Sequence, residues 1–402
     1  MTLKLGIIRE GKIPPDKRVP FTPLQAEEIG QRFPNVKVVI QESPIRCFND
    51  DEYGELGMRI SADVSDCDIL MGIKEVPIEQ LVAGKTYLFF SHTIKKQPHN
   101  KKLIRAILDK KIRMIDYEVL KDKLGNRLVA FGRFAGIVGA YNGLWTYGKR
   151  YNRFALRRAF ECFDVNDLKI ELRKVKLPPV KILLTGAGRV GKGAMETLDT
   201  VGIRKVSPSD FLRQTYDEAV YTQLSSADYH IRKEGGHFNR EEFHLNPEKY
   251  SGDFLKYTRV ADMLLAGAFW NPKAPVLFTV QDMQAPDFKI KIIADITCDI
   301  GGSIPSTKIA SSISDPIYDY DPSTDSVQPP LTNEKFVTVM GVDNLPCELP
   351  RSASEEFGRD LLDRILVPLL VKDVDKIIER ATITKDGKLT PQFSYLQDYA
   401  TG

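Results

Sequence analysis

Val180-Lys181-Ile182-Leu183-Leu184-Thr185 runs directly into Gly186-Ala187-Gly188-Arg189-Val190-Gly191 in the middle of this 402-residue chain. A GxGxxG turn between a strand and a helix is the fingerprint of dinucleotide binding. The first glycine permits the tight turn, the second lets a pyrophosphate approach the backbone, and the third allows close helix–strand packing. The phosphates would lie at the positive end of a helix that begins near Val190. The same pattern also fits an ordinary βαβ unit without a ligand.

The rest of the central region continues as an α/β domain. We expect a helix from Lys192 to a C-capping Gly202, followed by a strand at Ile203–Val206. The charged stretch from about 208 to 260 is weakly periodic and predicts an insertion, and the proline-rich chain from 305 to 330 predicts irregular structure. Three later apolar runs predict further buried strands: Met263–Phe269, Ile290–Ile296 and Phe336–Val342.

The N-terminal region alternates short apolar runs with helical segments, which is typical of an α/β domain with a largely parallel sheet. The first helix has a capping box at Thr22 and Gln25, with Pro23 in its first position. The predicted strands are Leu3–Ile8, Val36–Ile40, Ile69–Gly72, Thr86–Phe90 and Arg113–Ile115.

Two further helices are expected near the ends of the central region. Residues 133 to 160 predict one long, glycine-rich helix. Ser352 and Glu355 are spaced as a capping box before a terminal helix, and Asp386-Gly387 predicts a turn. The apolar stripe of the terminal helix predicts core positions at Phe357, Leu361, Leu362, Ile365, Leu366 and Leu369.

Composition excludes several classes of protein. Hydrophobic residues make up 42% of the chain, charged residues 28%, and the formal net charge is +3, which argues against nucleic-acid or membrane-surface binding. The five cysteines are dispersed without metal-ligand spacing, so we expect reduced thiols, no metal site and a cytoplasmic location. No apolar stretch approaches the ~18 residues that span a bilayer.

Polar side chains follow two predicted strands of the first domain. Lys74-Glu75 comes after the run that ends at Ile73, and His92 follows Phe90-Ser91. Ligands of open parallel sheets bind beyond the carboxyl ends of the strands, so Lys74 and His92 are candidates for acid–base roles. The alternative is a hydrogen-bonded histidine and a surface lysine.

Two more positions are candidates for binding. Arg18 can clamp a carboxylate with its planar guanidinium. Asp299, in Asp295-Ile296-Thr297-Cys298-Asp299-Ile300-Gly301-Gly302, can face a nicotinamide ring or belong to a simple turn.

Several motifs occur together in order: Gly72-Ile73-Lys74-Glu75, Phe90-Ser91-His92-Thr93-Ile94-Lys95, Ile115-Asp116-Tyr117-Glu118, Val129-Ala130-Phe131-Gly132 and Asp343-Asn344-Leu345-Pro346. With them, nearly the whole chain resembles the lysine-forming saccharopine dehydrogenase family, and in particular its lysine–ketoglutarate reductase members. More distantly it resembles alanine dehydrogenase and the transhydrogenase nucleotide-binding subunit.

The resemblance implies two Rossmann-like domains with parallel sheets and a cleft between them, the first domain being discontinuous. We expect a substrate domain at residues 1–140 plus 345–402 and a cofactor domain at 141–344. The implied reaction condenses lysine with 2-oxoglutarate and reduces the imine with NAD(P)H to saccharopine. No metal is implied, and a homo-oligomer is possible.

The resemblance also implies roles for individual residues. Lys74 and His92 match the catalytic acid–base pair. The substrate residues that match are Arg18, Glu75, Lys95, Glu118 and Arg127. The cofactor positions that match are Gly186, Gly188, Arg189, Val190, Gly191, Ser207, Asp299 and Asn344.

Ser207 is where NAD-preferring members carry an acid that binds the ribose 2′-hydroxyl. A serine leaves room for a 2′-phosphate, with Arg213 or Arg232 as a source of charge, so we predict NADP(H). Asp210 can instead reach the ribose and favour NAD(H).

Two other functions remain open. One is an alanine dehydrogenase or another opine-type dehydrogenase, which a test of ammonia plus pyruvate against lysine plus 2-oxoglutarate would distinguish. The other is a nucleotide-binding sensor without catalysis, in which the stretch from 208 to 260 is an interaction surface.

Overall fold

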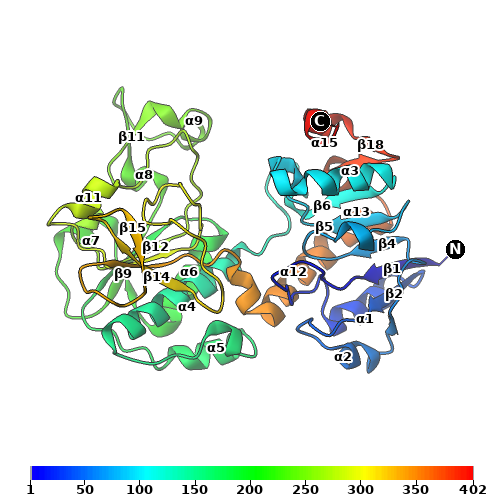
Figure 1. Cartoon of the computed structure of the whole chain (residues 1–402), viewed down its shortest axis with the longest axis horizontal. Coiled ribbons are helices and arrows are strands. Elements are labelled where there is room, and N and C mark those ends of the chain that lie inside the picture. The colour runs from blue at the N-terminus through cyan, green and yellow to red at the C-terminus, as the bar shows by residue number, and fades with distance from the viewer. Residues whose placement is uncertain (1, 402) are drawn as a thin grey trace. The chain divides into compact units, whose positions relative to one another are not determined.

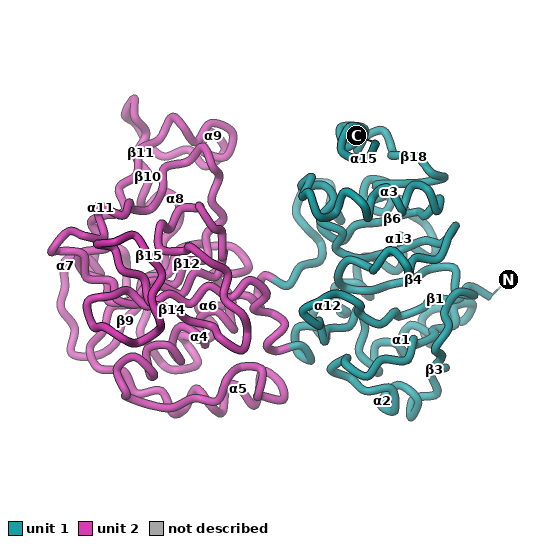
Figure 2. Tube along the Cα trace, viewed as in Figure 1, with its two compact units in different colours: residues 1–131, 350–402 teal, residues 132–349 magenta. Residues whose placement is uncertain are grey.

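The chain folds into two compact units (Figure 2). The structure is a computed structural model and describes residues 2–401. Unit 1 comprises Met1–Phe131 and Pro350–Gly402, and unit 2 comprises Gly132–Leu349. Each unit contains one eight-stranded, mostly parallel sheet with helices on it. The predicted α/β class and the discontinuous first domain are confirmed. No helix within residues 2–401 is long and apolar enough to cross a membrane.

The sheet of unit 1 has the order β18-β17-β6-β5-β4-β1-β2-β3 (Figure 1). Six strands run parallel, and the C-terminal hairpin β17–β18 adds antiparallel to β6. The strands are β1 (Leu3–Ile7), β2 (Val36–Gln41), β3 (Arg59–Ser61), β4 (Ile69–Met71), β5 (Thr86–Phe89), β6 (Arg113–Asp116), β17 (Thr382–Lys385) and β18 (Lys388–Leu389). The helices are α1 (Pro23–Arg32), α2 (Asp50–Gly54), α3 (Lys101–Asp109), α12 (Pro350–Arg364), α13 (Leu366–Leu370), α14 (Ile377–Ala381) and α15 (Gln397–Thr401).

Alternating side chains of this sheet form two apolar layers, because successive residues of a strand point to opposite faces. Ile69 and Met71 pack with α1 and with Phe357 and Leu361 of α12, whereas Leu70 packs with α3 on the other face. The capping box at Thr22 and the turn at Asp386-Gly387 form as expected. The segments that return after residue 350 therefore complete the core of unit 1.

The sheet of unit 2 has the order β15-β14-β16-β13-β12-β7-β9-β8. Its strands are β7 (Lys181–Thr185), β8 (Arg204–Lys205), β9 (Val220–Leu224), β12 (Met263–Ala266), β13 (Ile292–Asp295), β14 (Ile317–Asp321), β15 (Ser326–Gln328) and β16 (Val337–Met340). A separate hairpin pairs β10 (His230–Arg232) with β11 (Tyr250–Gly252). The helices are α4 (Gly132–Tyr151), α5 (Val165–Leu172), α6 (Arg189–Val201), α7 (Pro208–Arg213), α8 (Ser226–Tyr229), α9 (Arg240–Leu245), α10 (Leu255–Thr258) and α11 (Val280–Gln284).

Helix α4 lies against α6 and the sheet through a row of glycines. A Cβ atom on Gly136 would lie 1.9 Å from the Val190 carbonyl oxygen, and one on Gly143 would lie 2.5 Å from a Met263 methyl group. Larger residues at these positions would push α4 away from its neighbours. The close approach explains why this helix is rich in glycine.

Several expectations about element boundaries were wrong. The long helix ends at Tyr151, not at 160, because Asn152 adopts a left-handed φ of 50°. The terminal helix begins at Pro350, so Ser352 lies inside it and is not its N-cap. The proline-rich stretch to 330 contains the antiparallel strands β14 and β15.

The stretch from 208 to 260 also differs from the expected insertion. It contains β9, which pairs along its whole length with β7 in the middle of the sheet. The part that stands outside the sheet is the segment from α8 through β11. Its Phe238, Phe243 and Tyr250 form a small apolar cluster with Trp270 and Ala274 of the loop after β12. We call this segment, residues 226–252, the hairpin lobe.

Candidate functional site

The glycine-rich turn of unit 2 has the geometry that a dinucleotide requires. Gly186 has a φ of +103°, and a Cβ there would lie 2.8 Å from the Gly267 carbonyl oxygen. A Cβ on Gly191 would lie 2.1 Å from the Gly186 carbonyl oxygen, so α6 can approach the turn only at a glycine. A Cβ on Gly188 would have nothing within 4 Å, which leaves its backbone open to a ligand. Gly186 therefore permits the tight turn, Gly188 leaves room for a ligand to approach the backbone, and Gly191 permits close packing of the helix.

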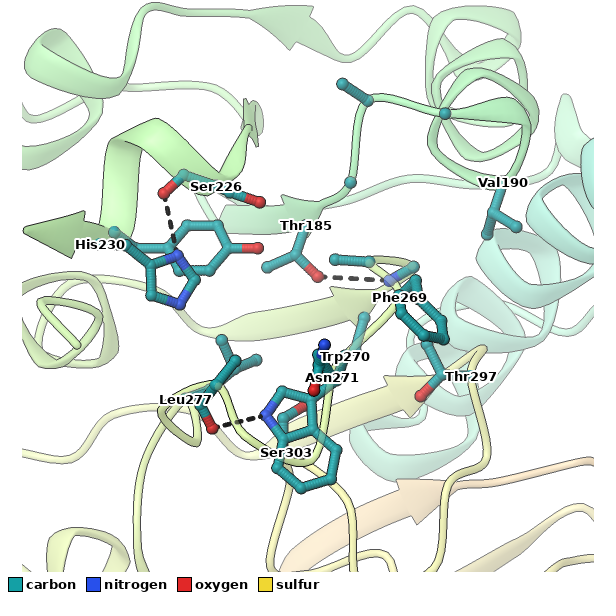
Figure 3. Close-up of a pocket in the computed structure, with 18 of the residues that line it drawn as sticks. Thr185, Val190, Ser226, His230, Phe269, Trp270, Asn271, Leu277, Thr297 and Ser303 are labelled. Carbon is teal, nitrogen blue, oxygen red and sulfur yellow. Dashed lines mark hydrogen bonds between the residues drawn. The ribbon is translucent and has the colours of Figure 1, made fainter. Parts of the chain in front are cut away.

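A pocket of about 350 Å³ lies above this turn (Figure 3). Its size is within the range of small-molecule sites. Four loops that follow parallel strands line it: those after β7, β9, β12 and β13, together with α9 of the hairpin lobe. The lining residues used below are Gly188, Ser226, His230, Trp270 and Thr297. The residues present fit a dinucleotide, because the pocket combines an exposed glycine backbone with aromatic walls.

The sheet order changes the argument for Ser207. Strand β8, which Ser207 follows, is at the edge of the sheet, and β9 lies between it and β7. The Oγ atom of Ser207 caps α7 and hydrogen-bonds to Asp210, 2.8 Å away. The strand next to β7 ends at Leu224, so Ser225 and Ser226 follow the strand that corresponds to the second strand of a Rossmann fold. Ser207 therefore does not follow the neighbour of β7, and its contact with a cofactor stays a prediction.

The other predicted cofactor residues are divided between the pocket and its surroundings. Gly186, Gly188, Arg189 and Val190 line the pocket, and Gly191 packs beneath it. Asp299 is an exposed residue in the turn after β13, and Asn344 precedes a 3-10 turn at Leu345–Glu348. Neither is among the lining residues, so their contact with a cofactor stays a prediction.

Unit 1 brings His92 and Glu75 into direct contact. The Nδ1 atom of His92 lies 2.7 Å from Glu75 Oε1, and Lys12 Nζ lies 2.9 Å from the other oxygen. Burial alone would raise the pKa of Glu75, but the hydrogen bonds from His92 and Lys12 outweigh it and hold that pKa well below its usual range. Because a carboxylate only accepts, Nδ1 of His92 carries the proton and Nε2 is available for proton transfer. His92 also has a left-handed φ of 52°, a strain that often accompanies functional sites.

A second acidic group, Glu118, follows β6. Lys95 Nζ lies 3.1 Å from its Oε1 atom and Arg127 Nη1 lies 4.0 Å away. The ring of Phe90 connects the two clusters: it is stacked near His92 at a centroid distance of 6.3 Å, and the Arg127 guanidinium lies 6.0 Å from its centre. Oxygen Oε2 of Glu118 is buried and has no hydrogen-bond partner among the described residues.

Lys74 lies in the loop after β4, and its position depends on a residue that the sequence analysis missed. Glu10 accepts hydrogen bonds from the backbone amides of Ile73 and Lys74, at 2.6 and 2.9 Å. Removal from water, and next the charge of Asp16, raise the pKa of Glu10 to about 8. Glu10 follows the apolar run of β1 just as Lys74 follows that of β4, so the rule used for Lys74 could have found it.

Arg18 is paired within unit 1. Its Nε and Nη2 atoms lie 3.0 and 2.6 Å from the two oxygens of Asp16, and its guanidinium stacks 4.2 Å from the centre of the Phe131 ring. Both members of the ion pair are almost completely buried. The Nε–Nη2 edge that would clamp a carboxylate is therefore occupied by Asp16.

Several known proteins are similar to this chain in sequence or in structure. The family "Alanine dehydrogenase/PNT, N-terminal domain" matches residues 6–138. The alpha-aminoadipic semialdehyde synthase of Mus musculus is 30% identical over 95% of this chain and 46% of its own length. The L-lysine-forming saccharopine dehydrogenase of Candida glabrata is 28% identical over 90% of this chain and 91% of its own.

An L-alanine dehydrogenase is similar in structure, with a TM-score of 0.67 at 16% identity over 99% of this chain and 100% of that chain. At this identity the likeness shows the fold alone. The chain spans about half the length of the semialdehyde synthases that it matches. Within residues 2–401, no group of three or more histidine, cysteine or acidic side chains is arranged to hold a metal ion.

Proposed function

We propose that the chain is an NAD(P)-dependent saccharopine dehydrogenase of the L-lysine-forming type. Its similarity to the saccharopine dehydrogenases and the match to the alanine dehydrogenase/PNT N-terminal domain support this proposal. It would interconvert lysine, 2-oxoglutarate and NAD(P)H with saccharopine. The observation that carries the proposal is the His92–Glu75 pair after β5 and β4, in a chain that also has an open glycine turn lining a pocket.

The acid–base chemistry of this reaction suits the residues of unit 1. Formation and hydrolysis of an imine require several proton transfers at nitrogen and oxygen, so groups that both donate and accept protons are needed. We assign these transfers to Lys74 and His92. Glu75 holds the His92 ring in one tautomer, and Glu10 holds the backbone of Lys74. The bound cofactor would supply the hydride.

The substrates carry charges of both signs that the same cluster can bind. Lys12, Lys95 and Arg127 are cations at the ends of neighbouring loops, and saccharopine has three carboxylates. The unpartnered buried Oε2 of Glu118 is an acceptor suited to a substrate amine. Arg18 would contribute mainly by fixing Asp16 and Phe131.

The preferred cofactor in this proposal is NADP(H). Ser225 and Ser226 follow β9, where an NAD-preferring site usually has an acid. The next acidic residue in the sequence, Asp228, is bound by the amide and hydroxyl of Ser225 at 2.7 and 2.8 Å. Two hydroxyl groups leave room for a 2′-phosphate. A Michaelis constant for NADH well below that for NADPH would refute this preference.

A panel of substrates tests the proposal as a whole. Purified protein is mixed with NADPH or NADH, one of several amino acids and one of several keto acids, and cofactor oxidation is followed by absorbance. We expect turnover that requires both lysine and 2-oxoglutarate. Turnover with ammonia and pyruvate instead would favour an alanine dehydrogenase, to which the N-terminal domain also points. No turnover with any pair would refute the enzymatic assignment.

A further inference from the structure

His230 is held rigidly at the edge of the unit 2 pocket. It is the first residue of β10 and lines the pocket, with 8% of its surface exposed. Its ring contacts those of Tyr229 and Phe243, at centroid distances of 4.6 and 4.4 Å. These two aromatic contacts and the burial of the side chain hold the imidazole in place, so its nitrogen atoms point in defined directions.

One nitrogen of this ring is already committed. Nδ1 lies 3.0 Å from the carbonyl oxygen of Ser226. A carbonyl only accepts, so Nδ1 donates its proton and Nε2 of the neutral ring has a free lone pair. Burial lowers the pKa of His230 and favours this neutral form.

The second nitrogen faces the pocket. Figure 3 shows Nδ1 on the side of Ser226 and the other nitrogen on the side of the pocket interior. Nε2 has no hydrogen-bond partner among residues 2–401. An acceptor fixed at the wall of a pocket and left without a donor is suited to a donor on the ligand.

The position of His230 indicates which part of a dinucleotide it would meet. In a Rossmann sheet the adenosine half lies beyond the second strand, and the nicotinamide half lies on the other side of the glycine turn. His230 follows β9, the neighbour of β7, whereas Thr297 and Ser303 follow β13. The wall near His230 is aromatic, with Tyr229, Phe243 and Trp270 among its residues. A flat heterocyclic base suits this end.

We propose that Nε2 of His230 accepts a hydrogen bond from the 6-amino group of adenine, so that the hairpin lobe selects the base of the cofactor. The proposal rests on the proposed function, in that it takes this pocket as the nicotinamide dinucleotide site. A hypoxanthine base has an oxygen in place of the amino group. That oxygen would meet the lone pair of Nε2 and be repelled.

The test compares two cofactors on the full chain. Binding of NADPH and of its hypoxanthine analogue, reduced nicotinamide hypoxanthine dinucleotide phosphate, is followed by the fluorescence of the reduced nicotinamide. We expect the analogue to bind about tenfold more weakly to the wild type, the effect of one lost hydrogen bond and one repulsive contact. In His230→Phe, which keeps an aromatic ring, the two should bind almost equally.

Two variants sharpen the comparison. His230→Gln provides an amide oxygen near the place of Nε2 and should retain part of the discrimination. His237→Phe is the matched control, because His237 belongs to the same lobe but is exposed and lies outside the pocket lining, and it should keep the wild-type ratio. The wild-type comparison needs no variant, so the test does not depend on the folding of His230→Phe.

Three results would overturn the proposal. The first is equal binding of both cofactors to the wild type. The second concerns His230→Phe: its ratio of NADPH to NADH affinity changes, while its ratio of affinities for the adenine and hypoxanthine cofactors stays that of the wild type. That result would assign Nε2 to the ribose. The third is that neither NADPH nor NADH binds, which would refute the proposed function as well and so is distinguishable from the first two.

Discussion

Replacing Glu10 by glutamine should weaken the loop that carries Lys74 and make stability depend less on pH. Glu10 uses both carboxylate oxygens to bind the amides of Ile73 and Lys74. Glutamine retains one acceptor oxygen and turns an NH₂ group toward the second amide. One hydrogen bond is then lost and one shielded amide has no acceptor, which costs about 1–3 kcal/mol of stability.

The pH dependence has a defined sign. The ordinary pKa of a glutamate side chain is 4.5. In the folded chain the pKa of Glu10 is raised to about 8, mainly because the group is buried. Below pH 4.5 the group is protonated in both states and has no effect. Between pH 4.5 and 8 the unfolded chain releases the proton and the folded chain keeps it, so the free energy of unfolding falls as pH rises.

The size of this effect follows from the shift. At about 1.4 kcal/mol per pH unit, the shift sets a ceiling of about 5 kcal/mol, and relaxation of the site should reduce this to about 2 kcal/mol. Because glutamine does not ionise, the Gln variant does not lose this stability as pH rises. It should therefore be clearly less stable than the wild type at pH 5 and nearly equal to it at pH 9.

Urea unfolding followed by far-ultraviolet circular dichroism at pH 5, 7 and 9 measures this difference. Tryptophan fluorescence is unsuitable, because Trp145 and Trp270 are both in unit 2. Glu79→Gln is the matched control: this exposed residue should show no change at any pH. A difference between wild type and Glu10→Gln that stays constant from pH 5 to 9 would refute the reasoning.

Further predictions concern packing and catalysis. Gly136→Ala should lower the free energy of unfolding by about 1–3 kcal/mol because its Cβ would meet a carbonyl of α6, whereas Gly30→Ala, with open space around it, should leave stability unchanged or raise it slightly in thermal unfolding. Lys74→Met and His92→Gln should each lower kcat at least 100-fold, which is the size of effect expected when general acid–base catalysis is lost. The Kd for NADPH should stay unchanged, and weaker NADPH binding would contradict their assigned roles. Glu75→Gln should lower kcat about tenfold because the charge that orients His92 is lost, and an unchanged kcat would show that the pair is only structural.

The sequence predicted those features whose cause is local. The strand and glycine turn at Gly186, the capping box at Thr22 and the apolar stripe containing Phe357 all depend on neighbouring residues, and all are present. The irregular region before Pro330 was misassigned because β14 carries Asp319. This buried acid is satisfied by Thr338 of the neighbouring strand, at 2.7 Å, which only the fold supplies.

The features that were missed depend on distant parts of the chain. Strand β8 follows α6 directly, and consecutive elements are usually neighbours, so it was taken as the strand next to β7. The fold inserts β9 between them, so Ser225 and Ser226, and not Ser207, follow the neighbour of β7. The place of Glu10 after β1 could be read from the sequence, but its partners could not, because they are backbone amides 63 and 64 positions away.

The most direct test of the central claim is the transfer of deuterium from the reduced cofactor to the product. Lysine and 2-oxoglutarate are incubated with the protein and with NADPH deuterated at the transferred position, and the product is analysed by mass spectrometry. We predict saccharopine with one deuterium on the carbon that joins the glutarate part to nitrogen, and none from Lys74→Met. Oxidation of the cofactor without deuterated saccharopine, or deuterium in alanine formed from pyruvate and ammonia, would contradict the account.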